Sequence, residues 1–121
     1  MDNNTIIIVI AVVLIGFGLL RMKLFGAAGI ASTERLQQLI DDGALVVDVR
    51  TPAEFAADHV DGAVNIPLDE IVGRKEELGD GERPVILYCN SGNRSGQALV
   101  RLHRQGLQNL TNGGGRHHMP S

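Results

Sequence analysis

The sequence contains no tryptophan and only one cysteine, Cys89, among its 121 residues. A single cysteine cannot form a disulfide within the chain, so the fold does not depend on oxidation. Aromatic residues make up only 3% of the chain, and beyond Ile30 they are Phe55 and Tyr88 alone. The core of that part must therefore be aliphatic, and roughly 90 residues can build only a modest one.

Basic residues are also scarce. Beyond Ile30 the chain has 9 Lys and Arg against 13 Asp and Glu. Nucleic-acid-binding domains usually carry a basic stripe or patch, which attracts phosphate groups. This acidic balance argues against nucleic acid as a partner.

Charge is absent altogether from residues 3–20, which are apolar almost throughout from Ile6 onward. A helix of this length would rise about 27 Å, close to the thickness of the hydrocarbon core of a bilayer. Arg21 and Lys23 follow, and such side chains can extend to the membrane interface. We therefore expect one transmembrane helix within residues 1–25, membrane contact through residues 6–20, a linker at 26–31 and a domain at 32–121.

The flanks of this segment bear on its orientation. No Lys or Arg precedes the apolar run, unlike in a signal peptide, although the small residues at 26–31 are compatible with a cleavage site. The basic residues lie on the C-terminal side, which favours a cytoplasmic domain. We expect a single-pass anchor in the cell membrane with the domain in the cytoplasm. The alternative is a periplasmic or secreted domain released by cleavage.

Strand and helix patterns alternate through the domain. Apolar runs predict buried strands at 45–49 and 84–88, and shorter ones predict strands at 63–65 and 107–111. Helices are predicted from the caps or starts at residues 32–33, 51, 67 and 97, and Thr51, Pro52 and Glu54 fit a capping box. This alternation predicts an α/β fold of three layers, with helices on both faces of a parallel sheet.

Cys89 ends the apolar run 84–88 and begins a short polar loop that leads into a helix. Unpaired N–H groups at a helix N-terminus, together with the helix dipole, form an anion site. A thiol placed there is pushed toward the thiolate, which is the nucleophilic form. We interpret Cys89 as a catalytic nucleophile rather than an inert core thiol. The expected substrate-binding residues are Asn90, Ser91, Gly92, Asn93, Arg94 and Ser95.

Asp48 and Arg50 end another apolar strand, so they are expected at the same edge of the sheet as Cys89 and in a supporting role. We expect Arg50 to pair with Glu54. For Arg94 two roles remain open: direct contact with substrate, or bracing of the loop against Asp48 or another carboxylate.

Residues 48–67 and 89–95, together with the glycines 113–114, resemble the rhodanese family of sulfurtransferases, in particular its small single-domain members of the phage-shock type. The similarity extends over about residues 30–116. It implies a rhodanese-like sheet of four to five parallel strands flanked by helices, and a persulfide on Cys89. The chain ends soon after the glycines, without the tryptophan and final helix that many relatives carry.

The resemblance implies a thiosulfate sulfurtransferase-like enzyme that uses a small anionic sulfur donor and a thiol, cyanide or protein acceptor. The alternatives are a membrane-tethered persulfide carrier or a partner-binding module without turnover. A phosphatase or arsenate reductase needs a C-x5-R loop, whereas Cys89 to Arg94 forms C-x4-R. No cofactor or metal is expected, and His117 and His118 are interpreted as solvated side chains of a polar tail.

Overall fold

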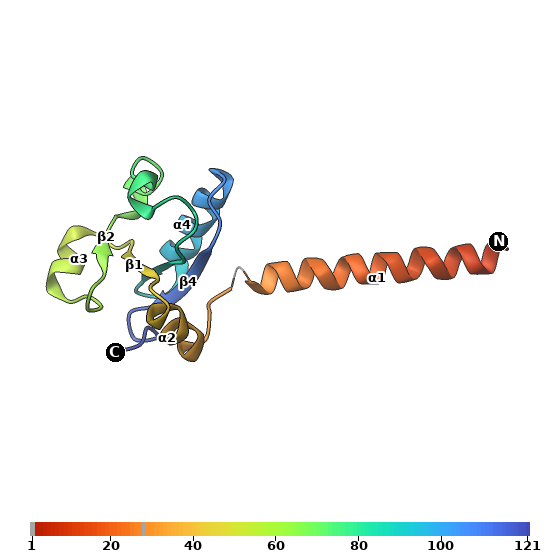
Figure 1. Ribbon diagram of the computed structural model, residues 1–121, viewed down its shortest axis with the longest axis horizontal. Helices are drawn as coiled ribbons and strands as arrows, with labels where there is room; N and C mark the ends of the chain where they lie inside the picture. Colours follow the sequence, from red (N-terminus) through yellow and green to blue (C-terminus); the bar gives the residue numbers. More distant parts are fainter. Residues whose placement is uncertain (1, 28) are drawn as a thin grey trace.

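The computed structural model describes the backbone of residues 2–27 and 29–121, and the side chains of residues 2–19 and 29–121. Its described strands form one sheet of four parallel strands in the order β2-β1-β3-β4 (Figure 1). These strands are β1 (Leu45–Asp48), β2 (Val64–Asn65), β3 (Val85–Cys89) and β4 (Leu110–Gly115). The prediction of a parallel α/β sheet is confirmed.

Both faces of the sheet are covered, which confirms the three predicted layers. α2 (Thr33–Asp41) packs on one face, and α4 (Asn93–Arg104) packs on the other. Successive side chains of a strand point to opposite faces, so Tyr88 packs on the α2 side and Cys89 on the α4 side. Both clusters are mainly aliphatic, as the scarcity of aromatic residues requires.

The register of the two central strands sets the position of the polar residues. Asp48 of β1 lies opposite Tyr88 of β3, the residue just before Cys89. Because the strands are parallel, the segments that follow Asp48 and Cys89 leave the sheet at the same edge. The predicted proximity of these two strand ends is therefore confirmed.

Two helix starts follow from local hydrogen bonding. The Ser32 hydroxyl accepts from the Arg35 N–H at 3.1 Å and caps α2. The short helix α3 (Pro52–Ala57) begins with the predicted capping box, in which the Thr51 hydroxyl and the Glu54 carboxylate each accept from the other residue's N–H.

The helix predicted to begin at residue 67 is wrong in type. The structure has two 3₁₀ helices there, η1 (Leu68–Glu70) and η2 (Lys75–Leu78), joined by turns. Apolar residues of this segment are nevertheless buried, since Ile71 and Leu78 are almost inaccessible. Gly73 lies between the two short helices, and glycine disfavours a continuous helix.

The last strand begins later than predicted. Residues 107–111 were expected, but β4 runs from Leu110 to Gly115. The Leu107 N–H still bonds to the carbonyl of Leu102 at the end of α4. A run of glycines is typical of a turn, but here it pairs with β3, where a register shift between Leu87 and Tyr88 accommodates it.

The C-terminal tail has a polar composition, but part of it is buried against the sheet domain. Met119 is 4% exposed and belongs to the cluster under α2 that contains Tyr88. The tail therefore helps to cover the face of the sheet on which α2 packs. Ile30 adds an isolated parallel bridge to Asn112, so this end of the linker lies along the β4 edge.

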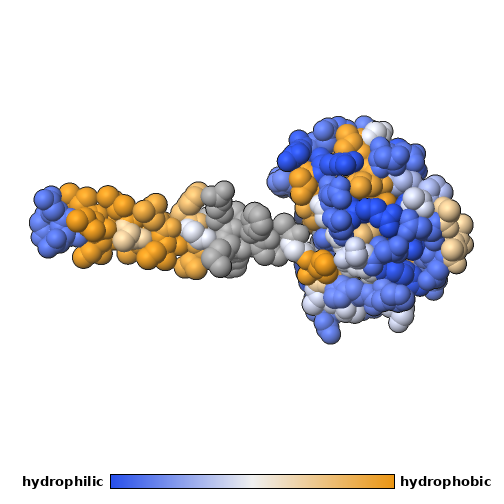
Figure 2. Space-filling view, turned by 180° about the vertical axis from the view of Figure 1, so that it is seen from behind, coloured by the Kyte–Doolittle hydropathy of each residue, from blue (hydrophilic) through white to orange (hydrophobic). Residues whose placement is uncertain are grey.

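α1 (Asn3–Ala27) extends away from the sheet domain (Figure 1). Its described apolar side chains are exposed and form a continuous hydrophobic surface on the face drawn in Figure 2. Among the described residues, no helix combines the length and the apolarity needed to cross a bilayer. The predicted transmembrane helix within residues 1–25 is not supported by this finding, and the side chains of Arg21 and Lys23 lie outside the described residues.

Candidate active site

Cys89 lies at the carboxyl end of β3 with only 1% of its surface exposed. Its Sγ accepts a hydrogen bond from the Gly92 N–H at 3.0 Å and lies 3.4 Å from the Ser95 Oγ. The strand therefore places the sulfur within the turn that precedes α4. The order of strand, loop and helix in the sequence predicts this arrangement.

The surroundings of Cys89 act on its pKa in two directions. Burial by itself raises the pKa of the thiol, because it disfavours the charged thiolate. The Ser95 hydroxyl and the backbone N–H groups of Ser95, Ser91 and Gly92 act against burial. Together these donors hold the Cys89 pKa below its ordinary value, which favours the nucleophilic form.

Gly92 allows the loop to turn so closely around the sulfur. Its φ of 92° lies in the left-handed region, which glycine adopts without the steric cost that other residues meet. A Cβ at this position would lie 2.8 Å from Cδ1 of Ile30 and 3.2 Å from Cα of Gly114. The loop is therefore packed directly against the linker and β4.

Arg94 does not extend freely over the loop. Its guanidinium donates to both carboxylate oxygens of Glu54, at 2.7 and 2.9 Å. The Asn90 side chain also donates to Glu54, at 2.7 Å. Of the two roles left open for Arg94, the structure shows the bracing contact, with Glu54 as the carboxylate. This ion pair holds the pKa of Glu54 well below its usual range.

Asp48 and Arg50 form a buried ion pair beside the loop. The Arg50 guanidinium donates to Asp48 Oδ2 at 2.7 Å, and the two side chains are 6% and 0% exposed. Arg50 also donates to the Asn90 side chain at 3.1 Å. The predicted pairing of Arg50 with Glu54 is wrong, because a carboxylate as buried as Asp48 requires a partner of its own. The hydrogen bond to Asn90 links this ion pair to the loop.

The side chains of Ser91 and Asn93 are exposed. Asn93 is already the first residue of α4, and its side chain accepts from Gln97 one turn later. Ser91 contributes to the sulfur site through its N–H group. The structure thus brings Gly92 and Ser95 to the sulfur, but not the side chain of Asn93.

Two residues near the loop were missed by the sequence interpretation. Glu54 was assigned only to the helix cap and to Arg50, yet it binds Arg94 and Asn90. Asn112 precedes the triple glycine and lies buried in β4, where its Oδ1 accepts from the Ser95 hydroxyl at 2.7 Å. An asparagine next to a glycine run resembles a turn signal, so the sequence pattern concealed this contact.

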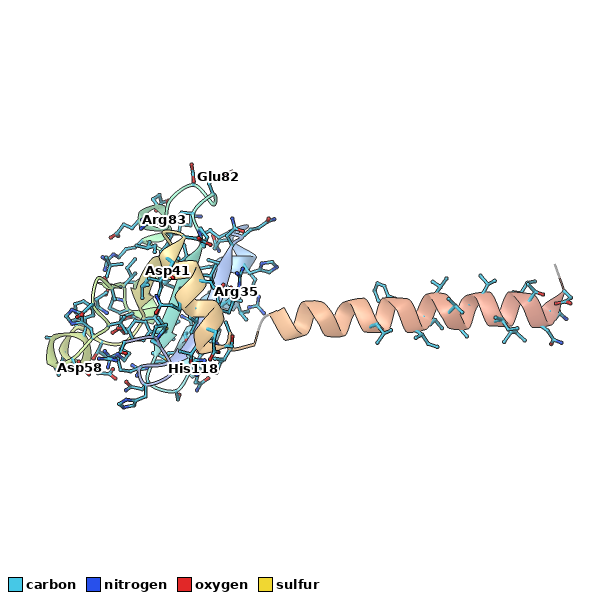
Figure 3. All side chains as sticks on the ribbon, turned by 60° about the horizontal axis from the view of Figure 1, so that its bottom comes forward. Arg35, Asp41, Asp58, Glu82, Arg83 and His118 are labelled. Carbon is cyan, nitrogen blue, oxygen red and sulfur yellow. The ribbon has the colours of Figure 1, made fainter. Side chains whose placement is uncertain are left out.

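The histidines lie outside the sulfur site. His59 stacks on Phe55 and lies with its Nδ1 2.8 Å from the Phe55 carbonyl oxygen, so it is held within its own turn. His118, labelled in Figure 3, is half-buried with its Nε2 2.6 Å from the carbonyl oxygen of Ala31, so it is not simply solvated. In the part of the chain that is described, no group of three or more His, Cys, Asp or Glu side chains is placed to hold a metal.

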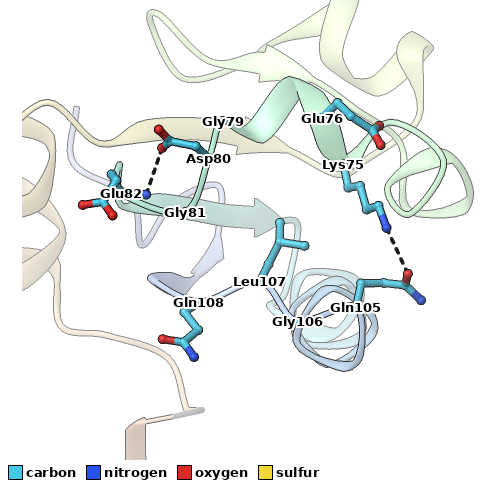
Figure 4. A pocket seen from close by; sticks show the side chains of 10 residues that line it. All are labelled: Lys75, Glu76, Gly79, Asp80, Gly81, Glu82, Gln105, Gly106, Leu107 and Gln108. Carbon is cyan, nitrogen blue, oxygen red and sulfur yellow. Dashed lines mark hydrogen bonds between the residues drawn. The ribbon is translucent and has the colours of Figure 1, made fainter.

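A surface hollow lies at the opposite edge of the sheet (Figure 4). The turn before β3 and the segment between α4 and β4 line it, with a hydrogen bond of 3.2 Å from Lys75 to Gln105 at one side. Cys89 ends β3, so it lies at the other edge. The hollow is thus separate from the sulfur site.

Comparison with known proteins identifies what this architecture is similar to. Residues 32–114 match the family model described as Rhodanese-like domain. The chain is 41% identical to thiosulfate sulfurtransferase PspE of Escherichia coli over 70 aligned residues, which cover 57% of this chain and 67% of that protein. It is 39% identical to a sulfurtransferase of Allochromatium vinosum over 82 residues, or 66% of this chain and 76% of that protein.

A solved structure described as rhodanese with anions, from E. coli, superimposes with a TM-score of 0.60 at 38% sequence identity. The superposition covers 64% of this chain and 95% of that chain. The similarity therefore includes nearly all of the solved protein and leaves out part of the present chain.

Proposed function

The chain belongs to the rhodanese-like domain family, and we propose that it transfers a sulfane sulfur from thiosulfate or a similar donor to a thiophilic acceptor through a persulfide on Cys89. Relatives named as sulfurtransferases support this enzymatic activity in general. The specific route through Cys89 is supported by the site itself.

The observation that carries the proposal is the set of donors around the only sulfur nucleophile of the chain. The Gly92 N–H lies 3.0 Å from Sγ, and the donors around the thiol lower its pKa despite its burial. Such donors stabilise a thiolate and also the negative charge that develops on sulfur as it is transferred. A buried structural cysteine has no need of them.

The reaction follows in two half-reactions. The Cys89 thiolate attacks the outer sulfur of thiosulfate, the S–S bond of the donor breaks, and its electron pair leaves with sulfite. Cyanide or a thiolate then attacks the outer sulfur of the persulfide, and Cys89 regains its thiolate. Covalent catalysis of this kind gives ping-pong kinetics.

The charged groups at the loop argue against phosphatase chemistry. A phosphatase of this general design directs its arginine at a tetrahedral oxyanion, but the Arg94 guanidinium is bound twice by Glu54. The C-x4-R loop is also one residue shorter than C-x5-R. Both features favour a site for a single sulfur atom.

Mass spectrometry of the protein after incubation with thiosulfate tests the proposal. We expect the mass of one added sulfur atom, its loss on addition of cyanide, and no addition to Cys89→Ser. A matched control is His103→Gln, an exposed substitution near the far end of α4, which should gain the sulfur as the wild type does. Absence of the added sulfur from the wild type would refute the persulfide.

The same experiment separates an enzyme from a carrier. A persulfide that forms with thiosulfate and is discharged repeatedly by small acceptors indicates turnover. A persulfide that forms but resists cyanide and free thiols would instead indicate a carrier that needs a protein acceptor. A partner-binding module would form no persulfide at all.

For the N-terminal segment we propose association with the cell membrane through residues 6–20, in a single pass with the domain on the cytoplasmic side. Its support is the exposure of the large apolar side chains from Ile6 to Leu19, which ranges from 41% to 65% without a preferred face of α1. A helix that is apolar on every side is typically buried in protein or lipid. Release of a periplasmic or secreted domain by cleavage is the alternative.

A further inference from the structure

Asn112 is a buried polar residue that the mechanism above does not use. Its side chain, 5% exposed, accepts from the Ser95 hydroxyl at 2.7 Å and from the Gly114 N–H at 2.9 Å, and it donates to the Gly92 carbonyl at 3.2 Å. The two backbone groups fix the orientation of the amide, because one can only donate and the other can only accept. The oxygen of Asn112 therefore faces Ser95.

The Ser95 hydroxyl has two neighbours that can accept its proton. Its Oγ is fully buried, 2.7 Å from Asn112 Oδ1 and 3.4 Å from Cys89 Sγ. A hydroxyl carries one proton, and an amide oxygen is only an acceptor. While Ser95 donates to Asn112, it presents a lone pair to the sulfur, and the sulfur receives no hydrogen bond from it.

We propose that Asn112 is a positioning residue that competes with the Cys89 sulfur for the Ser95 proton. Ser95 donates to Asn112 while the sulfur is neutral and rotates to donate to the sulfur while it is anionic. The catalytic use of this rotation rests on the proposed function, in which Sγ alternates between an anionic thiolate and the uncharged inner sulfur of a persulfide, whose negative charge lies on the outer sulfur. Only hydrogen bonds are exchanged, and the proton stays on Ser95.

The competition predicts how strongly Ser95 stabilises the thiolate. A hydrogen bond to a charged acceptor is roughly twice as strong as a neutral one. In the wild type Ser95 must give up its neutral bond to Asn112 when it turns to the thiolate, so about half of the stabilisation remains. Without Asn112 the full stabilisation is available. A purely structural Asn112 would predict no such dependence.

A double-mutant cycle on the Cys89 pKa tests this. The pKa is measured from the pH dependence of alkylation by iodoacetamide, and the signal has one source because Cys89 is the only cysteine. Four proteins are compared: wild type, Ser95→Ala, Asn112→Ala and the double variant. We expect Ser95→Ala to raise the pKa by about twice as much in the Asn112→Ala background as in the wild type.

The other charged groups around the loop are the same in all four proteins. They are the pair Glu54 and Arg94, from α3 and α4, and the pair Asp48 and Arg50, at the end of β1. Any effect that Asn112→Ala has on loop geometry is present in both of the proteins that lack Asn112. Their difference therefore reports the Ser95 hydroxyl alone.

Equal shifts in the two backgrounds, or a smaller shift without Asn112, would overturn the proposal and leave Asn112 a structural residue. Asn112→Ser, whose side chain is shorter, replaces the alanine variant if thermal unfolding shows that the latter does not fold. The alkylation readout requires no sulfur donor or acceptor. A wild type that failed to form a persulfide would thus refute the proposed function without deciding the role of Asn112.

Discussion

Glu54 and Arg94 form an ion pair beside the loop that holds Cys89, with two hydrogen bonds of 2.7 and 2.9 Å between guanidinium and carboxylate. The side chains are 29% and 32% exposed, so water and small anions can reach the pair. The positive charge of Arg94 is thus already compensated by a carboxylate. A dianion that approaches Cys89 must compete with Glu54 for Arg94.

Glu54→Gln should therefore improve the binding of thiosulfate. The substitution removes the competing negative charge, and glutamine still fits the capping box with Thr51. A partly exposed ion pair contributes on the order of 1 kcal/mol, which corresponds to a KM lower by about fivefold. Steady-state kinetics with varied thiosulfate provide the measurement. The control is Glu77→Gln, which removes one of the two carboxylate partners of Arg74 on the exposed surface. A KM lowered equally by both variants would contradict the argument.

The same pair predicts a pH dependence of stability. The pKa of Glu54 is lowered mainly by the hydrogen bonds from Arg94, from an ordinary value of 4.5. A lowered pKa contributes stability that is fully present above 4.5 and is lost as the pH falls through the lower folded value. The difference in Tm between wild type and Glu54→Gln should accordingly shrink as the pH falls from 7 to about 2. A difference that stays constant over this range would show that the ion pair does not contribute.

Gly115 of β4 lies directly against the backbone of the Cys89 loop, so its replacement should damage the site. A Cβ at this position would overlap the carbonyl oxygen of Asn90. Overpacking of this kind typically costs about 1–3 kcal/mol, and here the backbone next to Cys89 must move. Gly115→Ala should lower both the Tm and the rate of persulfide formation. Gly73→Ala, whose Cβ would meet the Glu70 carbonyl at an ordinary 3.6 Å, is the control that should leave persulfide formation unchanged.

Loop size gives a further prediction. The Gly92 N–H reaches Sγ at 3.0 Å because only two residues separate Cys89 from Gly92. A glycine inserted between Ser91 and Gly92 should move this donor away and reduce sulfur transfer by at least about tenfold, since a donor to a charged group contributes about 1.5–3 kcal/mol. The wild type should hydrolyse aryl phosphates negligibly. Glycine inserted between Gly79 and Asp80, in an exposed turn, is the control, and wild-type phosphatase turnover comparable to sulfur transfer would contradict the loop-size argument.

The parts of the fold that the sequence predicted well depend on local chemistry. The capping box at Thr51 uses residues three apart, and the position of Cys89 follows from one apolar strand and the polar loop after it. The meeting of Asp48 and Cys89 at one edge needs only the assumption of parallel strands. None of these inferences requires knowledge of how side chains from distant segments pack.

Contacts between distant segments were beyond such inference. Arg50 was expected to pair with Glu54, but the buried carboxylate of Asp48 binds Arg50 at the strand end, and Glu54 binds Arg94 instead. The contact of Asn112 with Ser95 depends on the glycine run that pairs with β3. Composition alone gave no sign that Met119 returns to the core. Each of these depends on the final packing of three layers.

The N-terminal segment yields the last prediction. Its apolar side chains, such as Leu14 at 65% exposure, would remain in water unless protein or lipid covers them, and soluble proteins rarely expose so large an apolar surface. We expect the full chain to sediment with membranes and resist carbonate extraction, and the chain without residues 1–25 to be soluble and active. Recovery of the full chain as a soluble monomer would refute membrane association.

The orientation is tested separately with a bulky membrane-impermeant maleimide, which needs a thiol more exposed than the buried Cys89. In a Cys89→Ser background, Ser121→Cys places a single thiol at an exposed position of the tail. A membrane-impermeant maleimide applied to intact spheroplasts should fail to label it if the domain is cytoplasmic, as the basic residues after the apolar run favour. Labelling before lysis would place the domain outside, and a soluble product that begins near residues 28–32 would show that the segment is a cleaved signal peptide.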